Sequence, residues 1–73
     1  QVDAKTKLQE FSLKKFKKLP IYKLISNTGP RHKPLFKVAV KLMDTKFYTA
    51  EGKSKKDAEQ NAAILCLENL KKI

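Results

Sequence analysis

Residues 52–63 read Gly-Lys-Ser-Lys-Lys-Asp-Ala-Glu-Gln-Asn-Ala-Ala. Ser54 is a good helix N-cap in this stretch, because its hydroxyl can accept a hydrogen bond from a first-turn amide that has no intrahelical partner. Asp57 favours the same helix start through the helix macrodipole. The stretch therefore predicts a helix from Ser54 to about Lys71, directly after a strand that ends in small residues.

Three lysines surround this helix start, namely Lys53, Lys55 and Lys56. A cation at the positive end of a helix destabilises it by about 0.3 kcal/mol or more, so this placement favours an anionic ligand. Free amides, the Ser54 hydroxyl and three ammonium groups would together bind phosphate. The alternative is that a lysine-rich chain simply places lysines on its surface, and this stretch alone leaves both interpretations open.

The composition bounds the class of protein. Seventy-three residues suffice for one domain with a small core, which argues against a multi-step enzyme with a deep pocket. The net charge of +10 favours a polyanionic partner, either nucleic acid or an anionic membrane. The lone Cys66 excludes an internal disulfide and is expected in the core, and no segment has the roughly 18 apolar residues that cross a bilayer. We expect a cytoplasmic domain.

A first helix is predicted from its N-cap, Asp3, to about Lys15, and Pro20 prevents its continuation. One arc of this helix is expected to pack inward, with its last member, Lys15, reaching out to solvent: Ala4, Leu8, Phe11 and Lys15, with Ser12 at the edge of the arc. The opposite arc faces water: Thr6, Gln9, Glu10 and Leu13. Uncharged polar groups suit hydrogen bonds to the 2′-hydroxyls of an RNA minor groove, although an ordinary solvated helix face has the same pattern.

Three strands are predicted over residues 21–28, 35–42 and 47–51. The middle strand has the clearest pattern, with one apolar set of alternating residues: Phe36, Val38, Val40 and Leu42. The other set is expected to face water: Lys37, Ala39 and Lys41. Short connections between the strands make their pairing antiparallel.

The connection over residues 27–34 is a turn-forming loop stiffened by two prolines, and its Gly29 permits an unusual backbone angle. Its tip carries Arg31, His32 and Lys33. A lone loop histidine is most often simply exposed, and no second His, Cys or clustered carboxylate suggests a metal. Held between two cations, His32 could instead hydrogen-bond inside a groove.

The last helix is expected to bury an arc that is small at its start and larger toward its end: Ala58, Ala62, Ala63, Leu65, Cys66, Leu70 and Ile73. Glu59 falls inside this arc, and the sequence offers no explanation for it. Both helices need the same sheet face. We therefore predict an α+β fold, an α-β-β-β-α two-layer sandwich with a three-stranded antiparallel sheet and both helices on one face.

This order of elements, with the 52–63 motif opening the last helix, resembles the double-stranded RNA-binding domain over residues 1–73. Three further motifs resemble the C-terminal domain of bacterial ribonuclease III. They are Asp-Ala-Lys-Thr-Lys-Leu-Gln-Glu at residues 3–10, Leu-Pro-Ile-Tyr at 19–22 and Gly-Pro-Arg-His-Lys-Pro-Leu-Phe at 29–36.

The resemblance implies three contacts with duplex RNA. The first helix would enter a minor groove through Thr6, Gln9 and Glu10. The loop after the first strand would enter the next minor groove through Arg31 and His32. The start of the last helix would grip phosphates across the major groove through Lys53, Ser54, Lys55 and Lys56.

Two positions depart from the family pattern. Leu13 lies on the contact face where ribonuclease III domains often carry a polar residue. Glu59 stands where many other double-stranded RNA-binding domains have a third lysine.

Together the three contacts would track about 16 base pairs of A-form duplex, by shape and not by base identity.

The resemblance further implies a substrate-gripping module of ribonuclease III, a homodimeric, Mg²⁺-dependent endoribonuclease that processes ribosomal, messenger and other structured RNAs. The same resemblance implies that its catalytic carboxylates lie in an N-terminal domain outside residues 1–73. The acidic residues of the present chain have no paired spacing that would supply them. We therefore expect no catalytic site, metal or cofactor in this domain, and by itself a monomer.

Two alternatives remain open. One is a domain of the same fold that serves mainly protein–protein interaction. The other is peripheral membrane binding, which would need an apolar stripe beside the lysines; the sequence offers only Leu13 and Phe16 for one.

Overall fold

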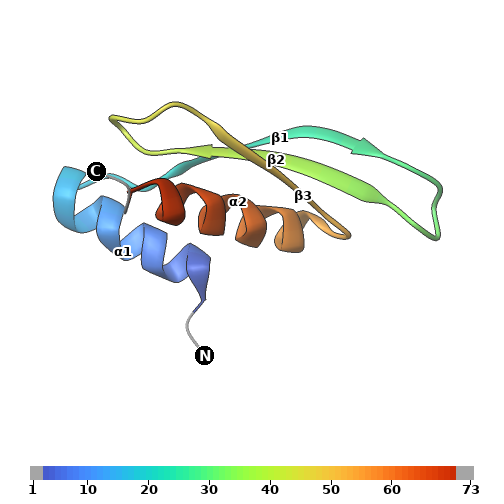
Figure 1. The fold of residues 1–73 in the computed structure, drawn as a ribbon, viewed down its shortest axis with the longest axis horizontal. Coiled ribbons are helices and arrows are strands. Elements are labelled where there is room, and N and C mark those ends of the chain that lie inside the picture. Colours follow the sequence, from blue (N-terminus) through green and yellow to red (C-terminus); the bar gives the residue numbers. More distant parts are fainter. Residues whose placement is uncertain (1–2, 71–73) are drawn as a thin grey trace.

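The computed structural model describes residues 3–70. Its elements follow in the predicted order: α1 (Ala4–Phe16), β1 (Ile21–Thr28), β2 (Leu35–Lys41), β3 (Tyr48–Gly52) and α2 (Lys55–Leu70). The strands form one antiparallel sheet in the order β1-β2-β3, and both helices lie on the same side of it (Figure 1). The predicted α+β sandwich is therefore confirmed. Lys71 and Ile73, which the sequence assigned to the last helix, lie outside the described residues.

The two helices cover the sheet unequally. α2 packs directly on β2 and β3, whereas α1 packs mainly against α2. On the covered face, Val40 of β2 lies opposite Tyr22 of β1 and Tyr48 of β3. The main core combines Leu8 of α1, β2 residues and the small residues of α2: Val40, Leu42, Ala62, Ala63 and Cys66. Within residues 3–70, no helix is long and apolar enough to span a membrane.

The predicted inward face of α1 needs a correction. Leu8 is fully buried, but so is Ser12, which the sequence placed at the edge, while Phe11 is 37% exposed. The Ser12 hydroxyl donates a hydrogen bond to the Lys18 carbonyl in the turn after the helix. This bond makes burial of a polar side chain tolerable, because a buried hydroxyl without a partner destabilises the fold.

The end of α1 has a left-handed C-cap that the sequence did not indicate, three residues before Pro20. Lys17 adopts a left-handed conformation with φ of 62°, and its amide donates a hydrogen bond of 3.0 Å to the Leu13 carbonyl. This C-cap satisfies a carbonyl at the helix end. The chain then reaches β1 through residues 18–20.

Two strand predictions also change. Ala39 was expected to face water, yet it is 2% exposed. Its cross-strand neighbours are Lys23 and Thr49, and neighbours on one sheet face lie close enough for larger side chains to cover a methyl group. The third strand begins at Tyr48, because Phe47 belongs to the connection, where the Thr45 hydroxyl accepts a hydrogen bond from the Leu42 amide.

Candidate nucleic-acid interface

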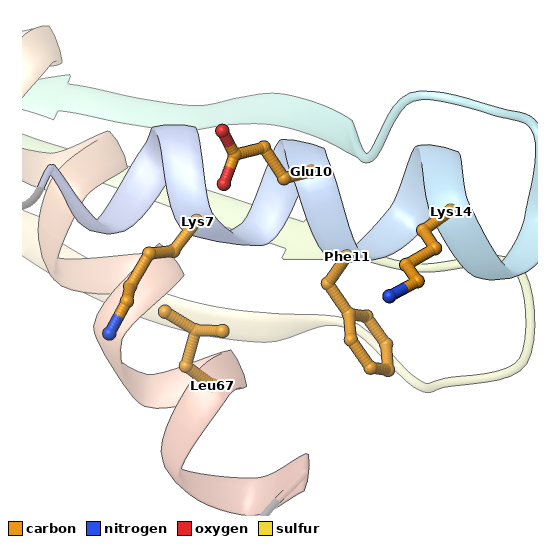
Figure 2. A pocket seen from close by; sticks show the side chains of 5 residues that line it. All are labelled: Lys7, Glu10, Phe11, Lys14 and Leu67. Carbon is orange, nitrogen blue, oxygen red and sulfur yellow. The ribbon is translucent and has the colours of Figure 1, made fainter.

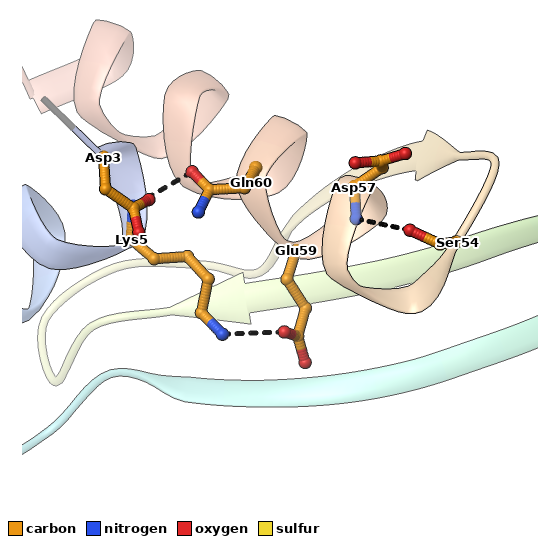
Figure 3. A network of polar contacts seen from close by, with 6 residues as sticks. All are labelled: Asp3, Lys5, Ser54, Asp57, Glu59 and Gln60. Atoms are coloured by element: carbon orange, nitrogen blue, oxygen red, sulfur yellow. Dashed lines mark hydrogen bonds and ion pairs between the residues drawn. The ribbon is translucent and has the colours of Figure 1, made fainter. Parts of the chain in front are cut away.

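The start of α2 is capped as predicted. The Asp57 amide donates a hydrogen bond of 3.0 Å to the Ser54 hydroxyl (Figure 3). The Ala58 amide donates a hydrogen bond of 2.9 Å to the Ser54 carbonyl. The Lys53, Lys55 and Lys56 side chains are exposed. Within residues 3–70 the ion pairs involve other lysines, so these three are not neutralised by a carboxylate. Their charges and the positive end of the helix together favour binding of an anion.

The alanines of α2 bring this helix start against the sheet. Gly52 ends β3 so near to α2 that an added Cβ would lie 2.4 Å from the Ala58 nitrogen. Ala58 itself is fully buried. The close packing fixes where the lysine-bearing turn lies relative to the strand that precedes it.

The loop between β1 and β2 lies beside this lysine cluster. Gly29 has φ of 91°, as the turn prediction required, and the Lys33 amide donates a hydrogen bond of 2.9 Å to the Pro30 carbonyl. A cleft of about 650 Å³ is lined by residues from the loop and by one lysine before α2: Thr28, Gly29, His32, Lys33, Pro34, Leu35 and Lys53. His32 and Lys53 thus line the same cleft. Arg31 is exposed at the loop tip and does not line the cleft.

The predicted contact face of α1 is open to solvent. Thr6, Gln9 and Glu10 are exposed, and Leu13 beside them is 40% exposed. Glu10 also lines a shallow hollow of about 330 Å³ with Lys7, Phe11, Lys14 and Leu67, and Figure 2 shows the Phe11 ring at this surface. Phe11 therefore borders the predicted contact face, which the sequence did not indicate.

The beginning of α1 is fastened to α2. The Lys5 ammonium lies 2.7 Å from Glu59 Oε1, and the Lys5 amide donates a weaker hydrogen bond of 3.4 Å to Gln60 Oε1 (Figure 3). Asp3 caps α1 by accepting a hydrogen bond of 3.0 Å from the same amide. A hydrogen bond from Gln60 is the main reason that the pKa of Asp3 lies below its usual value. Glu59, which the sequence left unexplained, thus has an ion-pair partner.

The three predicted contacts lie along the long axis of the molecule, whose extents are 40 × 27 × 22 Å. Figure 1 shows α1 toward one end, the loop between β1 and β2 at the other, and the start of α2 between them. Within residues 3–70, His32 of the loop and Lys53 before α2 line one cleft, and the ion pair of Lys5 and Glu59 joins α1 to α2. None of these contacts joins α1 to the loop.

Three residues that were not predicted as RNA contacts lie close to the predicted ones: Lys33, Lys5 and Glu59. Lys33 lines the cleft beside His32, and its position in a basic loop tip was a usable signal. The pairing of Lys5 with Glu59 could not be predicted from the sequence pattern, because the two residues are far apart in the chain.

Metal and thiol chemistry find no support in the described part of the chain. Residues 3–70 contain no group of three or more His, Cys, Asp or Glu side chains able to hold a metal ion. Cys66 is fully buried, and burial raises the pKa of its thiol, which disfavours the reactive thiolate. Its predicted place in the core is confirmed.

The fold and the distribution of charge together define the class of protein. An α-β-β-β-α sandwich with an exposed lysine cluster at a helix N-terminus, a basic loop beside it and a polar helix face is a nucleic-acid-binding domain. The family model described as the double-stranded RNA binding motif matches residues 4–70. The chain belongs to this family.

Known proteins are similar over nearly the whole chain. A protein named Ribonuclease 3 from Pelagibacter ubique is 83% identical over 70 residues, which are 96% of this chain and 32% of that protein. Ribonuclease 3 from Myxococcus xanthus is 44% identical over 97% of this chain and 27% of its own length. The chain thus spans about a third of the length of the curated relatives that it matches.

Solved structures agree on the fold. A structure of Arabidopsis HYL1, titled for its implications for miRNA processing, is similar with a TM-score of 0.78 and 39% identity. That match covers 94% of this chain and 97% of the HYL1 chain. The first double-stranded RNA-binding domain of DRB4 has a TM-score of 0.79 and 26% identity, with 96% of this chain and 97% of that chain covered.

Proposed function

We propose that this domain binds double-stranded RNA by shape and serves as the substrate-gripping C-terminal module of a ribonuclease III. The observation that carries the proposal is the exposed lysine cluster of Lys53, Lys55 and Lys56 at the capped start of α2, in a chain of this family. The similarity to proteins named Ribonuclease 3 supports the parent enzyme.

Each of the three surfaces would contribute a different interaction. The lysines and Ser54 at the α2 start would hold phosphates across a major groove. Thr6, Gln9 and Glu10 on α1 would hydrogen-bond to 2′-hydroxyls in one minor groove, while Arg31 and His32 would reach the next. Because the contacts address backbone and hydroxyl groups, binding would depend on A-form geometry and not on sequence.

Cleavage would belong to another part of the parent enzyme. We propose an N-terminal catalytic domain outside residues 1–73 that holds Mg²⁺ and forms a homodimer, while the present domain is by itself a monomer and gives substrate affinity. The lack of a metal-binding cluster within residues 3–70 is consistent with this division. The free, buried Cys66 needs no oxidising compartment, which supports a cytoplasmic location.

The central experiment removes two charges of the cluster. Lys55→Ala combined with Lys56→Ala should weaken binding to an RNA duplex of about 16 base pairs by about tenfold or more, because two phosphate contacts are lost. The slope of log affinity against log salt should become shallower by about 1.4 to 1.8. Fluorescence anisotropy at several salt concentrations measures both quantities.

A matched control distinguishes the effect of the lysine cluster from the effect of total charge. Lys18→Ala combined with Lys23→Ala also removes two positive charges, but from exposed positions outside the proposed site, and should change affinity much less. The Tm of the Lys55 and Lys56 variant should not fall, because cations at a helix N-terminus are unfavourable. Equal losses in both double variants would contradict a specific phosphate contact at α2.

A domain used mainly for protein interaction is the second candidate, and one surface favours it. Leu19, Ile21 and Met43 are more than half exposed and line a hollow of about 200 Å³ with Lys18 and Lys41. Adjoining exposed apolar side chains often mark a protein contact. Retention of RNA-processing activity by a parent enzyme carrying the Lys55 and Lys56 substitutions would favour this candidate.

A further inference from the structure

A partly buried ion pair outside the proposed RNA-binding residues lies where three elements meet. The Lys5 ammonium of α1 lies 2.7 Å from the Glu59 carboxylate of α2 and 5.2 Å from the ring centroid of Tyr22 on β1. The side chains of Lys5 and Glu59 are 36% and 16% exposed. A partly buried pair at this distance is less screened by water and salt than a surface pair.

A second ion pair in the same fold provides the comparison. Lys15 and Asp44 are 3.8 Å apart, and both side chains are 54% exposed. Pairs of that kind contribute little to stability or geometry, since solvent competes for both charges. The two pairs therefore differ in burial and distance while carrying the same charges.

The Lys5–Glu59 pair stands between two of the proposed RNA contacts. Lys5 directly precedes Thr6 and lies one helical turn before Gln9. Glu59 lies one turn after Lys55 and Lys56. The pair thus joins α1 to α2 close to the residues that would meet RNA, and the hydrogen bond from the Lys5 amide to Gln60 supports the same junction.

A carboxylate at this place has an electrostatic disadvantage. Glu59 carries a negative charge one turn from lysines that would bind phosphate, so it weakens their attraction for RNA. A neutral side chain there would be better for phosphate binding alone. The ion pair with Lys5 supplies the compensating benefit, because it fixes α1 relative to the lysine cluster.

We propose that Lys5 and Glu59 form a positioning pair, which holds the α1 contact face and the α2 lysines at the spacing that lets both engage one RNA duplex at once. The inference rests on the proposed binding of duplex RNA. Two contacts held in one geometry bind more tightly than the same contacts on elements that are free to move, because less conformational entropy is lost on binding.

Charge-neutral double variants test the pair. Lys5→Gln with Glu59→Gln leaves the net charge unchanged, as does the control Lys15→Gln with Asp44→Asn. The first should weaken binding to a duplex of about 16 base pairs by about threefold or more, and the control should bind like the unmodified domain. Duplex affinity is measured by fluorescence anisotropy below the melting transition of each variant.

A shorter duplex separates positioning from a general loss of structure. A duplex of about 8 base pairs is half the length that a domain of this family spans, so it cannot use all contacts together. The Lys5 and Glu59 double variant should bind this short duplex as well as the unmodified domain does. Equal losses on both lengths, or no loss on the longer duplex, would overturn the positioning role.

The single variant Glu59→Gln gives a second test, in which charge and positioning predict opposite changes in affinity. It raises the net charge by one, as does Asp44→Asn, so charge alone predicts tighter binding in both. Positioning predicts that Glu59→Gln binds the longer duplex more weakly than Asp44→Asn does, and tighter or equal binding would overturn it. Failure of the duplex-binding proposal itself would be seen separately, as unchanged affinity in the Lys55 and Lys56 variant.

Discussion

Tyr22 has the least favourable polar environment among the described residues. Its hydroxyl oxygen is buried and has no hydrogen-bond partner within residues 3–70. Burial is the main cause that raises the pKa of Tyr22 to about 12, and the negative charge of Glu59 adds to it. The ring itself packs against the core and lies beneath the Lys5 ammonium. The ring is therefore useful to the fold, whereas the hydroxyl is not.

Tyr22→Phe should stabilise the domain by about 1 kcal/mol at neutral pH, because it removes a buried polar group that lacks a partner. The difference should grow between pH 10 and 12. In that range the phenol ionises in the unfolded chain first, so the unmodified protein loses stability as pH rises, and the variant lacks this particular loss. Urea unfolding at several pH values measures both effects, and a destabilised variant would mean that the hydroxyl has a partner.

At the scale of elements, the junction between β3 and α2 controls where the lysine cluster lies. Ser54 caps the helix, and Gly52 allows the helix backbone to come within contact of the strand end. A Cβ at Gly52 would lie 2.4 Å from the Ala58 nitrogen and 2.7 Å from the Asp57 carbonyl carbon. Both atoms are backbone, so they cannot move aside as a flexible side chain would.

Gly52→Ala should therefore destabilise the domain by about 1 to 3 kcal/mol, as overpacking does elsewhere. Thr49→Ala, at an exposed position of the same strand, should have a much smaller effect and serves as the control. Thermal unfolding followed by circular dichroism gives both values. A Gly52→Ala variant as stable as the unmodified domain would show that the helix can shift away from the strand without loss.

At the scale of the whole molecule, charge and shape act together. A net charge of +10 on a domain with a long axis of 40 Å attracts any polyanion, whatever its helical form. Discrimination between RNA and DNA must come from groups that detect groove shape and 2′-hydroxyls. We propose the polar face of α1 for that task, since Gln9 can hydrogen-bond to a hydroxyl without adding charge.

Gln9→Ala should reduce the preference for an RNA duplex over a DNA duplex of the same length, with little change in salt dependence. The reason is that the substitution removes a hydrogen-bonding group and no charge. Competition between labelled RNA and unlabelled DNA duplexes measures the preference. Losses of equal size on both nucleic acids would mean that α1 does not distinguish them.

Most of the secondary structure could be predicted because its signals are local. The cap at Ser54 and the turn at Gly29 each depend on neighbouring residues, and the structure confirms both. The strand at β2 is confirmed as well, but its predicted alternation is not, because Ala39 is buried like Val38 and Val40. The positions assigned wrongly depend on non-local partners. Ser12 is buried because the Lys18 carbonyl accepts its hydroxyl, and Ala39 is buried because neighbouring strands flank it.

The sequence by itself determined the order of elements, the basic charge and the family, since composition, periodicity and capping are properties of a linear chain. Only the tertiary structure decided which distant residues meet. It placed His32 and Lys53 in the lining of one cleft, paired Lys5 with Glu59 near Tyr22, and turned Phe11 toward the surface. Such contacts arise from packing between elements, and the periodicity of one element carries no information about the distance to its neighbour.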